Sequence, residues 1–325
     1  MKAIVCEAFG GPEVLHLRDV ADPAPPGAGE VQVRIAARGV QYVDVLMLAG
    51  KYQFRPEPPF VPGNEAAGEV VAVGEGVTRF KPGDKVMSRH RLGAFATLGN
   101  ARAENCSPVP AGLSIEEAAV FSGAYMTAYH ALLQRGRLQA GDWVMINGAA
   151  GGIGIAAIQV AKLFGATVIA TASTDEKRAA CLEEGADYAI DYRQGLRDKV
   201  KELTGPRDGV DIVYDPIGAE VFDESLRCLR WGGRILVLGF LGGGPSTPRT
   251  NYLLIKGLEV IGVRLGGVTE QQPEIGRENM RKLCELAGQG KLRPRISHRF
   301  PLERAGDAIQ AVIDRKVIGK AVLVG

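Results

Sequence analysis

Six short apolar segments alternate with helix-length stretches in the second half of the chain, and this alternation most constrains the fold. The segments are residues 143–147, 167–171, 187–191, 210–215, 234–239 and 258–263. Buried parallel strands form continuous apolar runs because helices cover both faces of the sheet, and each crossover between them needs a helix. The alternation therefore predicts an α/β domain with a doubly wound, six-stranded parallel sheet.

The residues before this region predict a mainly β domain. Short apolar or alternating segments at 1–6, 30–40 and 68–74 are separated by loops rich in Gly and Pro, which interrupt both helices and strands. We therefore divide the chain into residues 1–122 and residues 123–264.

The remaining residues, 265–325, have a different pattern. Helical periodicity at 277–290 and 302–315 is followed by a last apolar segment, KAVLVG. We expect this tail to return to the first domain.

The segment NGAAGGIG, residues 147–154, lies between the first apolar run and an amphipathic helical stretch. Gly151 and Gly154 take the last two glycine positions of a G-x-G-x-x-G turn, and Ala149 takes the first. A side chain at Gly151 would keep a pyrophosphate from the backbone, and one at Gly154 would separate helix from strand. The turn predicts dinucleotide binding at a helix N-terminus, although a glycine-rich turn without a ligand is the alternative. The binding residues are then Ala149, Ala150, Gly151, Gly152, Ile153 and Gly154.

The end of the second apolar run indicates which dinucleotide binds. A carboxylate there would bind the ribose 2′-hydroxyl of NAD and repel the 2′-phosphate of NADP. This run ends in Ala172 and Ser173, and Ser173-x-x-Glu176 has the spacing of a helix capping box. Lys177 follows in the same turn, where a cation could reach a 2′-phosphate. We therefore expect NADPH as the cofactor rather than NADH.

Four segments carry a resemblance to a known family. They are GVQYVDVLMLAGKY at 39–52, PGNEAAGEVVAVGEGVTRFKPGDKV at 62–86, TAYHAL at 127–132 and NGAAGGIG at 147–154. Over essentially its whole length the chain resembles the medium-chain dehydrogenase/reductase superfamily, specifically its zinc-free quinone oxidoreductase branch. The resemblance implies a GroES-like β domain, a Rossmann domain, and an enzyme that transfers hydride from NADPH.

Two positions distinguish this chain from the zinc alcohol dehydrogenases of that superfamily. Those enzymes carry a Cys after the Gly of the first segment and a His before the Glu of the second. This chain has Val40 and Asn64 there, and neither is a zinc ligand, because zinc binds thiolate, imidazole or carboxylate. Without a metal to polarise an oxygen, the substrate must be electrophilic by itself, as quinones and α,β-unsaturated carbonyls are. We expect no metal and a small electrophilic substrate.

The resemblance also implies individual site residues. On the substrate side these are the catalytic Tyr52 and Gln41 and the substrate-binding Tyr42, Asp44 and Arg264. Tyr52 could donate a hydrogen bond or proton to a developing oxyanion, although a packed aromatic side chain is the alternative. On the cofactor side the resemblance adds Thr127, Ser173, Lys177, Tyr192, Gly239, Phe240 and Lys320.

The charges nearly cancel, with 39 Lys and Arg against 37 Asp and Glu, which argues against nucleic acid as a partner. No apolar run approaches the roughly 18 residues of a membrane span, and the five cysteines are scattered singly. We expect a cytoplasmic protein with no membrane partner. By resemblance, the edge segment 258–263 pairs with its copy in a homodimer.

Two other functions stay open. An NADPH-dependent alkenal, enone or enoyl-thioester reductase meets the same chemical requirement. A basic patch for coenzyme A would favour thioesters, but RHR at 89–91 and RPRISHR at 293–299 are as well explained as solvated surface. An NADPH-binding protein with a structural or nucleic-acid-associated role is the alternative outside the enzymes.

Overall fold

The computed structural model describes residues 1–325, which form two compact units. Unit 1 comprises Met1–Gly123 and Cys284–Gly325, and unit 2 comprises Ala124–Leu283. The sequence pattern had placed the return to the first domain at residue 265. In the structure, residues 265–283 pack with unit 2 and the return begins at Cys284.

Unit 2 contains one six-stranded sheet in which every neighbouring pair is parallel. Its spatial order is β10-β9-β8-β11-β12-β13, the order of a doubly wound dinucleotide-binding fold. The strands are β8 (Trp143–Ile146), β9 (Thr167–Thr171), β10 (Tyr188–Ile190), β11 (Val210–Asp215), β12 (Leu229–Val237) and β13 (Glu259–Gly262). The predicted fold class is confirmed. The strand order reverses between β8 and β11, so their carboxyl ends border the crevice where such sheets bind ligands.

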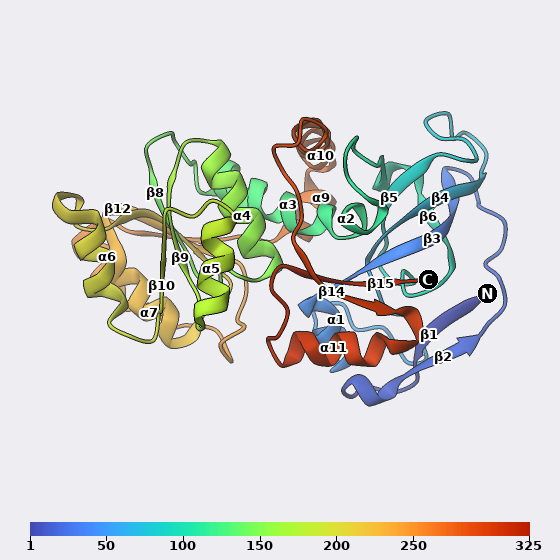
Figure 1. The fold of residues 1–325 in the computed structure, drawn as a ribbon, viewed down its shortest axis with the longest axis horizontal. Helices are drawn as coiled ribbons and strands as arrows, with labels where there is room; N and C mark the ends of the chain where they lie inside the picture. The colour runs from blue at the N-terminus through green and yellow to red at the C-terminus, as the bar shows by residue number, and fades with distance from the viewer. The chain divides into compact units, whose positions relative to one another are not determined.

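Helices cover both faces of this sheet. Figure 1 shows α4 and α5 side by side, and α6 and α7 pack together on inward-facing side chains that include Met145, Ile169 and Val213. Successive side chains of a strand point to opposite faces of the sheet, so the residues next to these three face the helices on the other side. The helices of unit 2 are α4 (Gly152–Leu163), α5 (Asp175–Glu183), α6 (Leu196–Thr204), α7 (Ala219–Cys228), α8 (Thr250–Lys256) and α9 (Leu265–Gln271).

The helix after β9 begins one residue later than the capping-box spacing predicts. Thr174 is its N-cap, and its hydroxyl accepts a hydrogen bond from the Lys177 backbone N–H at 3.3 Å. The capping box predicted at Ser173 and Glu176 is therefore wrong. A cap requires only a hydroxyl and a backbone donor, and neighbouring Thr174 meets that need without a glutamate.

Unit 1 is built on a seven-stranded sheet with the order β14-β15-β3-β4-β5-β7, in which β6 also pairs with β3. Blue β3 and red β15, from opposite ends of the chain, lie antiparallel side by side in Figure 1. The sheet strands are β3 (Glu30–Val40), β4 (Glu65–Val73), β5 (Lys85–Arg89), β6 (Leu98–Arg102), β7 (Cys106–Pro108), β14 (Ile296–Pro301) and β15 (Lys320–Val324). A separate hairpin joins β1 (Lys2–Cys6) to β2 (Leu15–Asp19).

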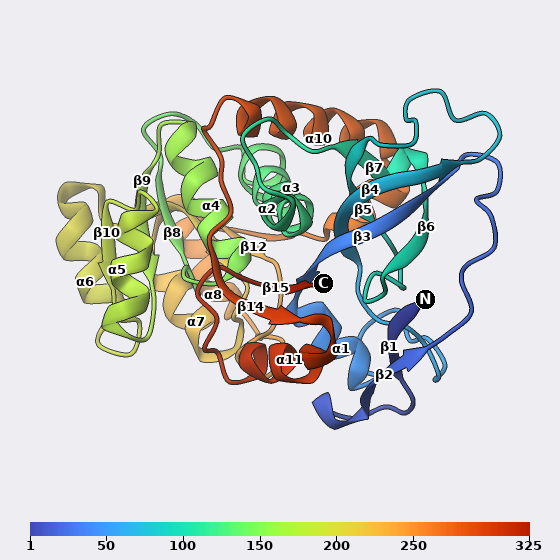
Figure 2. The same ribbon diagram turned by 45° about the vertical axis from the view of Figure 1, so that its right-hand side comes forward.

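One core of unit 1 lies beneath α11. Figures 1 and 2 both place α11 along β14, and Leu302, Ala308 and Ile309 pack there against Ile4, Leu48 and Leu323. The remaining helices are α1 (Tyr42–Leu48), α2 (Ile115–Ala119), α11 (Ala305–Ile313), and α3 (Phe121–Tyr129) and α10 (Pro273–Gly288), which cross the unit boundary. A π-helical turn, His130–Arg135, continues α3. None of the helices has both the length and the apolar character required to cross a membrane.

Candidate functional site

The glycine turn joins β8 to α4, as its sequence predicts. Gly151 is the N-cap of α4, with extended backbone angles of φ −78° and ψ 168°. The turn is fixed by hydrogen bonds from the Ala149 N–H to the Thr171 carbonyl at 3.1 Å and from the Gly151 N–H to the Gly148 carbonyl at 3.1 Å. The first amides of α4 lack partners within the helix, so this end of the helix favours an anion.

Gly151 and Gly154, the two motif glycines of the turn, have different surroundings. A Cβ at Gly154 would lie 2.5 Å from the Ala149 carbonyl oxygen, so a side chain there would push helix and strand apart. A Cβ at Gly151 would meet only the Gly148 carbonyl oxygen, at an ordinary 3.4 Å. Packing within the protein therefore requires glycine at 154, whereas a Cβ at 151 would have space around it.

A buried polar network lies beneath the turn. Asn147 donates hydrogen bonds to Asp215 at 3.0 Å and to Ser225 at 2.9 Å, and accepts one from Thr171 at 3.2 Å. Burial raises the pKa of Asp215, and hydrogen bonds from Asn147 and from the backbone of Ile217 and Gly218 oppose this shift. The network connects the carboxyl ends of β8, β9 and β11. Sequence reasoning missed it, although Asn147 and Asp215 each stand at the end of an apolar run.

Cations gather where β9 and β10 end. The Arg193 guanidinium donates two hydrogen bonds to Asp191, at 2.9 and 2.7 Å, and one to the Ser173 carbonyl at 2.5 Å. Arg178 lies 3.6 Å from the same carboxylate, and hydrogen bonds from Arg193 hold the pKa of Asp191 far below its usual value. The one buried acid at this edge is thus compensated by two guanidinium groups, and Lys177 lies on the same turn of helix as Arg178. Sequence reasoning missed Asp191 and Arg193, which directly flank the named Tyr192.

The other residues predicted in unit 2 are spread over three elements. Thr127 lies half-buried on α3, and Gly239 and Phe240 follow β12, with Phe240 half-exposed. Arg264 follows β13, and its guanidinium forms an ion pair with Glu270 at 3.5 Å. The structure therefore gives Arg264 a protein partner on α9.

Unit 1 brings Gln41 and Asn64 together. The Gln41 Nε2 donates to the Asn64 Oδ1 at 2.8 Å, and the Gln41 backbone N–H donates to the Asp44 carboxylate at 2.8 Å. Asp44 and Gln41 form the capping box of α1. Two of the predicted substrate-side residues therefore fix the start of this helix.

Asp44, Glu65 and Lys320 form a buried charged group beside this helix. The Lys320 Nζ donates to the Glu65 carboxylate at 2.9 Å, and the other Glu65 oxygen accepts from the Gly123 N–H at 3.0 Å. The second Asp44 oxygen is buried without a hydrogen-bond partner. Burial raises the pKa of Asp44 to about 7, with a further increase from Glu65. Lys320, predicted near the pyrophosphate, has its ammonium bound to Glu65 in this structure.

The two predicted tyrosines differ in exposure. Tyr42, at the start of α1, is 40% exposed, and Tyr52 is half-buried. Neither hydroxyl forms a hydrogen bond within the protein. Both hydroxyls are therefore available to a ligand.

The positions that carry zinc ligands in the zinc alcohol dehydrogenases have other roles here. Val40 is buried in β3 and pairs with Ala321, and the Asn64 side chain is bonded to Gln41. No group of three or more His, Cys, Asp and Glu side chains in the chain is arranged to hold a metal ion.

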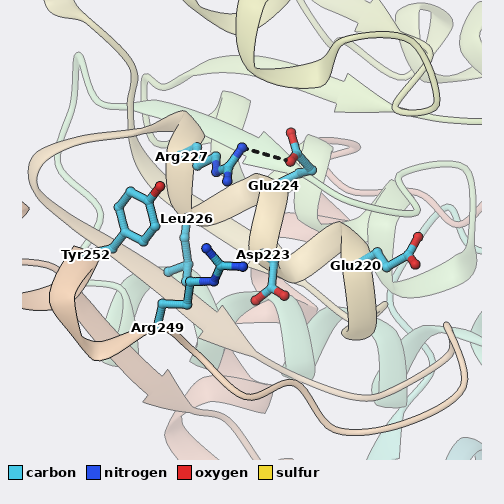
Figure 3. Close-up of a pocket in the computed structure, with 7 residues that line it drawn as sticks. All are labelled: Glu220, Asp223, Glu224, Leu226, Arg227, Arg249 and Tyr252. Atoms are coloured by element: carbon cyan, nitrogen blue, oxygen red, sulfur yellow. Dashed lines mark hydrogen bonds and ion pairs between the residues drawn. The ribbon is translucent and has the colours of Figure 1, made fainter.

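A separate cavity of about 330 Å³ lies between α7 and the start of α8. Figure 3 shows Arg249 and Asp223 extending toward each other there, and the Arg227–Glu224 ion pair spans 3.4 Å. The lining consists of Glu220, Asp223, Glu224, Leu226, Arg227, Arg249 and Tyr252. It includes none of the predicted site residues and is mostly charged.

Two family descriptions match separate parts of the chain. "Alcohol dehydrogenase GroES-like domain" matches residues 27–133, and "Zinc-binding dehydrogenase" matches residues 152–284.

Individual proteins match almost end to end. Quinone oxidoreductase-like protein 2 of Mus musculus is 37% identical over 324 residues, covering 99% of this chain and 91% of that protein. The crystal structure of a probable oxidoreductase from Mycobacterium abscessus has a TM-score of 0.91 and 39% identity, covering 100% of this chain and 99% of the other. Escherichia coli quinone oxidoreductase, crystallised with NADPH, has a TM-score of 0.92 and 32% identity, with both chains covered completely.

Proposed function

We propose that this chain, which belongs to the quinone oxidoreductase branch of the medium-chain dehydrogenase/reductase superfamily, is a zinc-independent oxidoreductase. In the proposed reaction it transfers hydride from NADPH to quinones or similar electrophilic carbonyl compounds. The observation that most supports this proposal is the open space around the Cβ position of Gly151. A glycine that the protein's own packing does not require, at a helix N-terminus beside a strand-order reversal, supports a bound pyrophosphate.

The cofactor preference follows from the charges at the ends of β9 and β10. Ser173 and Lys177 would hold the 2′-phosphate, with Tyr192 beside the adenosine end. Arg193 and Arg178 neutralise Asp191, so the one buried acid at this edge does not repel a phosphate. Bound NADPH would supply hydride, and the glycine turn, Thr127, Gly239 and Phe240 would orient it.

The acceptor side of the proposal rests on unit 1. Gln41 is held by Asn64, and Tyr42 and Tyr52 have hydroxyls that can donate to an oxygen on which negative charge develops. Asp44 is completely buried, so we assign it a positioning role through the Gln41 backbone. Lys320 similarly acts through Glu65.

Zinc independence is part of the proposal. Val40 and Asn64 offer neither thiolate nor imidazole, and Asn64 is engaged with Gln41 at 2.8 Å. The acceptor would therefore have to form a stabilised anion on its own when it receives hydride.

We also propose a cytoplasmic homodimer formed through β13. This strand is the outer edge of its sheet. Large exposed apolar side chains occur on β13, with Val260 38% exposed, on β12, with Trp231 74% exposed, and on α8, with Leu254 84% and Ile255 70% exposed. Pairing of two β13 edges would cover unpaired backbone groups. The five cysteines are free thiols, which fits a reducing compartment.

The test is oxidation of NADPH and NADH against a panel of quinones and enals, with metal analysis of the same preparation. We expect turnover with NADPH and quinones at far less than one zinc per chain. A protein that binds NADPH but oxidises it with no acceptor would contradict the enzymatic proposal.

A charge reversal tests the cofactor site separately. Lys177→Glu should raise the KM for NADPH much more than that for NADH, because only NADPH carries the 2′-phosphate. Lys199→Glu on α6 is the matched control and should change neither KM. An equal effect of Lys177→Glu on both cofactors would remove Lys177 from the site.

A further inference from the structure

Arg89 is a half-buried cation whose guanidinium contacts no protein carboxylate directly. It is the last residue of β5 and lies directly opposite Glu65 in the antiparallel register with β4. Both Glu65 oxygens are already engaged, by Lys320 at 2.9 Å and by the Gly123 N–H at 3.0 Å. Arg89 forms neither a hydrogen bond nor an ion pair; burial lowers its pKa, and the negative charge of Glu65 opposes this shift without a direct contact. A guanidinium has five N–H donors, and partial burial without acceptors is unfavourable.

The register shows which face Arg89 occupies. Directly opposed residues of an antiparallel pair project to the same face, so Arg89 shares the face of Glu65. Ser88 and His90 project to the other face, where their side chains are bonded at 2.8 Å. The His90 backbone N–H donates to the Asn64 carbonyl at 2.9 Å, so this segment is tied to the residue that holds Gln41.

A second unpaired arginine lies two residues further along. The Arg91 guanidinium lies 3.8 Å from the centroid of the Phe54 ring, in the segment that also carries Tyr52. Its positive charge is exposed and faces no carboxylate. Arg18, by contrast, is a surface arginine that is ion-paired, with Glu7 at 2.7 Å. The Gln41 region therefore has an excess of positive charge.

We propose that the acceptor carries a carboxylate, and that Arg89, assisted by Arg91, binds it. The inference rests on the proposed function and specifies its substrate class: a quinone or α,β-unsaturated carbonyl compound with an anionic substituent. A guanidinium binds a carboxylate through two parallel hydrogen bonds, which would satisfy the donors that Arg89 leaves unpaired.

The carboxylate takes no part in the redox step. Hydride carries two electrons from the nicotinamide to the electrophilic carbon of an unsaturated carbonyl compound or to a quinone, and NADP⁺ is released. A proton from solvent neutralises the resulting enolate or hydroquinone anion. The carboxylate leaves unchanged, so its contribution is to binding and orientation.

The experiment compares two naphthoquinones with the same ring. One carries a 2-carboxyethyl side chain, and the other carries its methyl ester, so the electron affinity of the ring is matched and only the charge differs. We expect kcat/KM to favour the acid by about tenfold or more, the effect of a charge-assisted hydrogen bond. In Arg89→Gln this acid-to-ester ratio should fall to near one.

Arg55→Gln is the matched control, because it removes the same charge from a guanidinium that lies 4.5 Å over the Phe9 ring instead. The acid-to-ester ratio should stay at the wild-type value in this variant. An equal fall of the acid-to-ester ratio in Arg55→Gln and Arg89→Gln would indicate that the overall positive electrostatic field favours the acid, and would overturn the assignment to Arg89. A wild-type ratio near one would do the same. A phosphate-bearing analogue that outperforms the acid would overturn the choice of carboxylate.

Calorimetric titration keeps this inference separate from the proposed function. 1-Naphthoate and 1-naphthamide are titrated into the NADP⁺-saturated protein and into Arg89→Gln. Tighter binding of naphthoate that disappears in Arg89→Gln supports the carboxylate site even if no quinone is reduced, in which case only the proposed function fails. Turnover of both quinones without Arg89-dependent naphthoate binding leaves the function intact and refutes the carboxylate site.

Discussion

Alanine substitutions at Gly151 and Gly154 should have opposite consequences, although the two residues lie three positions apart in one turn. Gly154→Ala places a methyl group 2.5 Å from the Ala149 carbonyl oxygen and 2.7 Å from the Ala149 carbonyl carbon. These are backbone atoms that cannot rotate away. Gly151→Ala places its methyl group 3.4 Å from the Gly148 carbonyl oxygen, which is an ordinary contact.

The magnitudes follow from these distances. Overpacking costs about 1–3 kcal/mol, and a contact this short with backbone atoms belongs to the upper part of that range, about 2–3 kcal/mol. Replacing glycine by alanine within a helix recovers about 1 kcal/mol, so Gly154→Ala should lower the free energy of unfolding by about 1–2 kcal/mol. At Gly151 the loss of a favourable N-cap residue and the lower entropy of the unfolded alanine chain are each about 0.5–1 kcal/mol, with opposite signs. Gly151→Ala should therefore leave stability within about 0.5 kcal/mol of the wild type.

The assay combines thermal unfolding with NADPH titration. Gly154→Ala should lower the melting temperature by about 2–8 °C. Gly151→Ala should melt with the wild type but bind NADPH at least about tenfold more weakly, because its methyl group would occupy the phosphate position. Wild-type affinity in a stable Gly151→Ala protein would refute the assignment of that space to a pyrophosphate. An unchanged melting temperature in Gly154→Ala would refute the packing argument.

Three further substitutions test buried polar groups. Asp44→Asn should abolish one pH dependence of stability. The folded carboxyl, with a pKa of about 7, keeps a proton that the same carboxyl in the unfolded chain releases near its ordinary pKa. The free energy of unfolding of the wild type should therefore fall as pH rises between about 4 and about 7, and that of the variant should not. Melting temperatures at the two ends of this range measure the effect, and parallel curves for both proteins would contradict it. Arg38→Met should cost about 2–6 kcal/mol, because the Arg38 guanidinium is buried and donates to the carbonyl oxygens of Ile35 and Ala96 at 2.9 and 2.8 Å; a thermal melt within 2 °C of the wild type would be inconsistent with this. Asn147→Leu should lower the melting temperature and weaken NADPH binding together, since it removes the side-chain donor to the Asp215 carboxylate and the acceptor of the Thr171 hydroxyl; loss of only one property would separate the network from the turn.

The sheet of unit 2 could be predicted because its strands are buried on both faces. The run at 167–171 and the run at 210–215 match β9 and β11 at both ends. β12 begins at Leu229, five residues before the predicted 234, because its first residues pair with β11 across a bulge while Trp231 is exposed. Burial determines the apolar pattern, so a strand that begins outside the core is detected late.

The glycine turn could also be recognised from the sequence, but its supporting network could not. The two bonded partners Asn147 and Asp215 are 68 residues apart, and each is an ordinary residue of a strand end until the parallel register brings them together. Arg193 was missed for a related reason. Its role depends on the buried Asp191 beside it, and sequence alone does not reveal that this acid is buried.

Lys320 shows a different limit of sequence reasoning. A family resemblance predicts where the backbone of a residue lies, but not which group its side chain contacts. The ammonium of a lysine lies at the end of four flexible methylenes, so its partner is the anion that lies nearest in a low-dielectric environment. In this chain that anion is Glu65, 255 residues away, bound at 2.9 Å. Because Lys320 is bound to Glu65, the opposed Arg89 makes no direct contact with that carboxylate and feels only its charge. This arrangement supports the proposal that Arg89, in a basic segment that sequence reasoning explains as solvated surface, binds an acidic substrate.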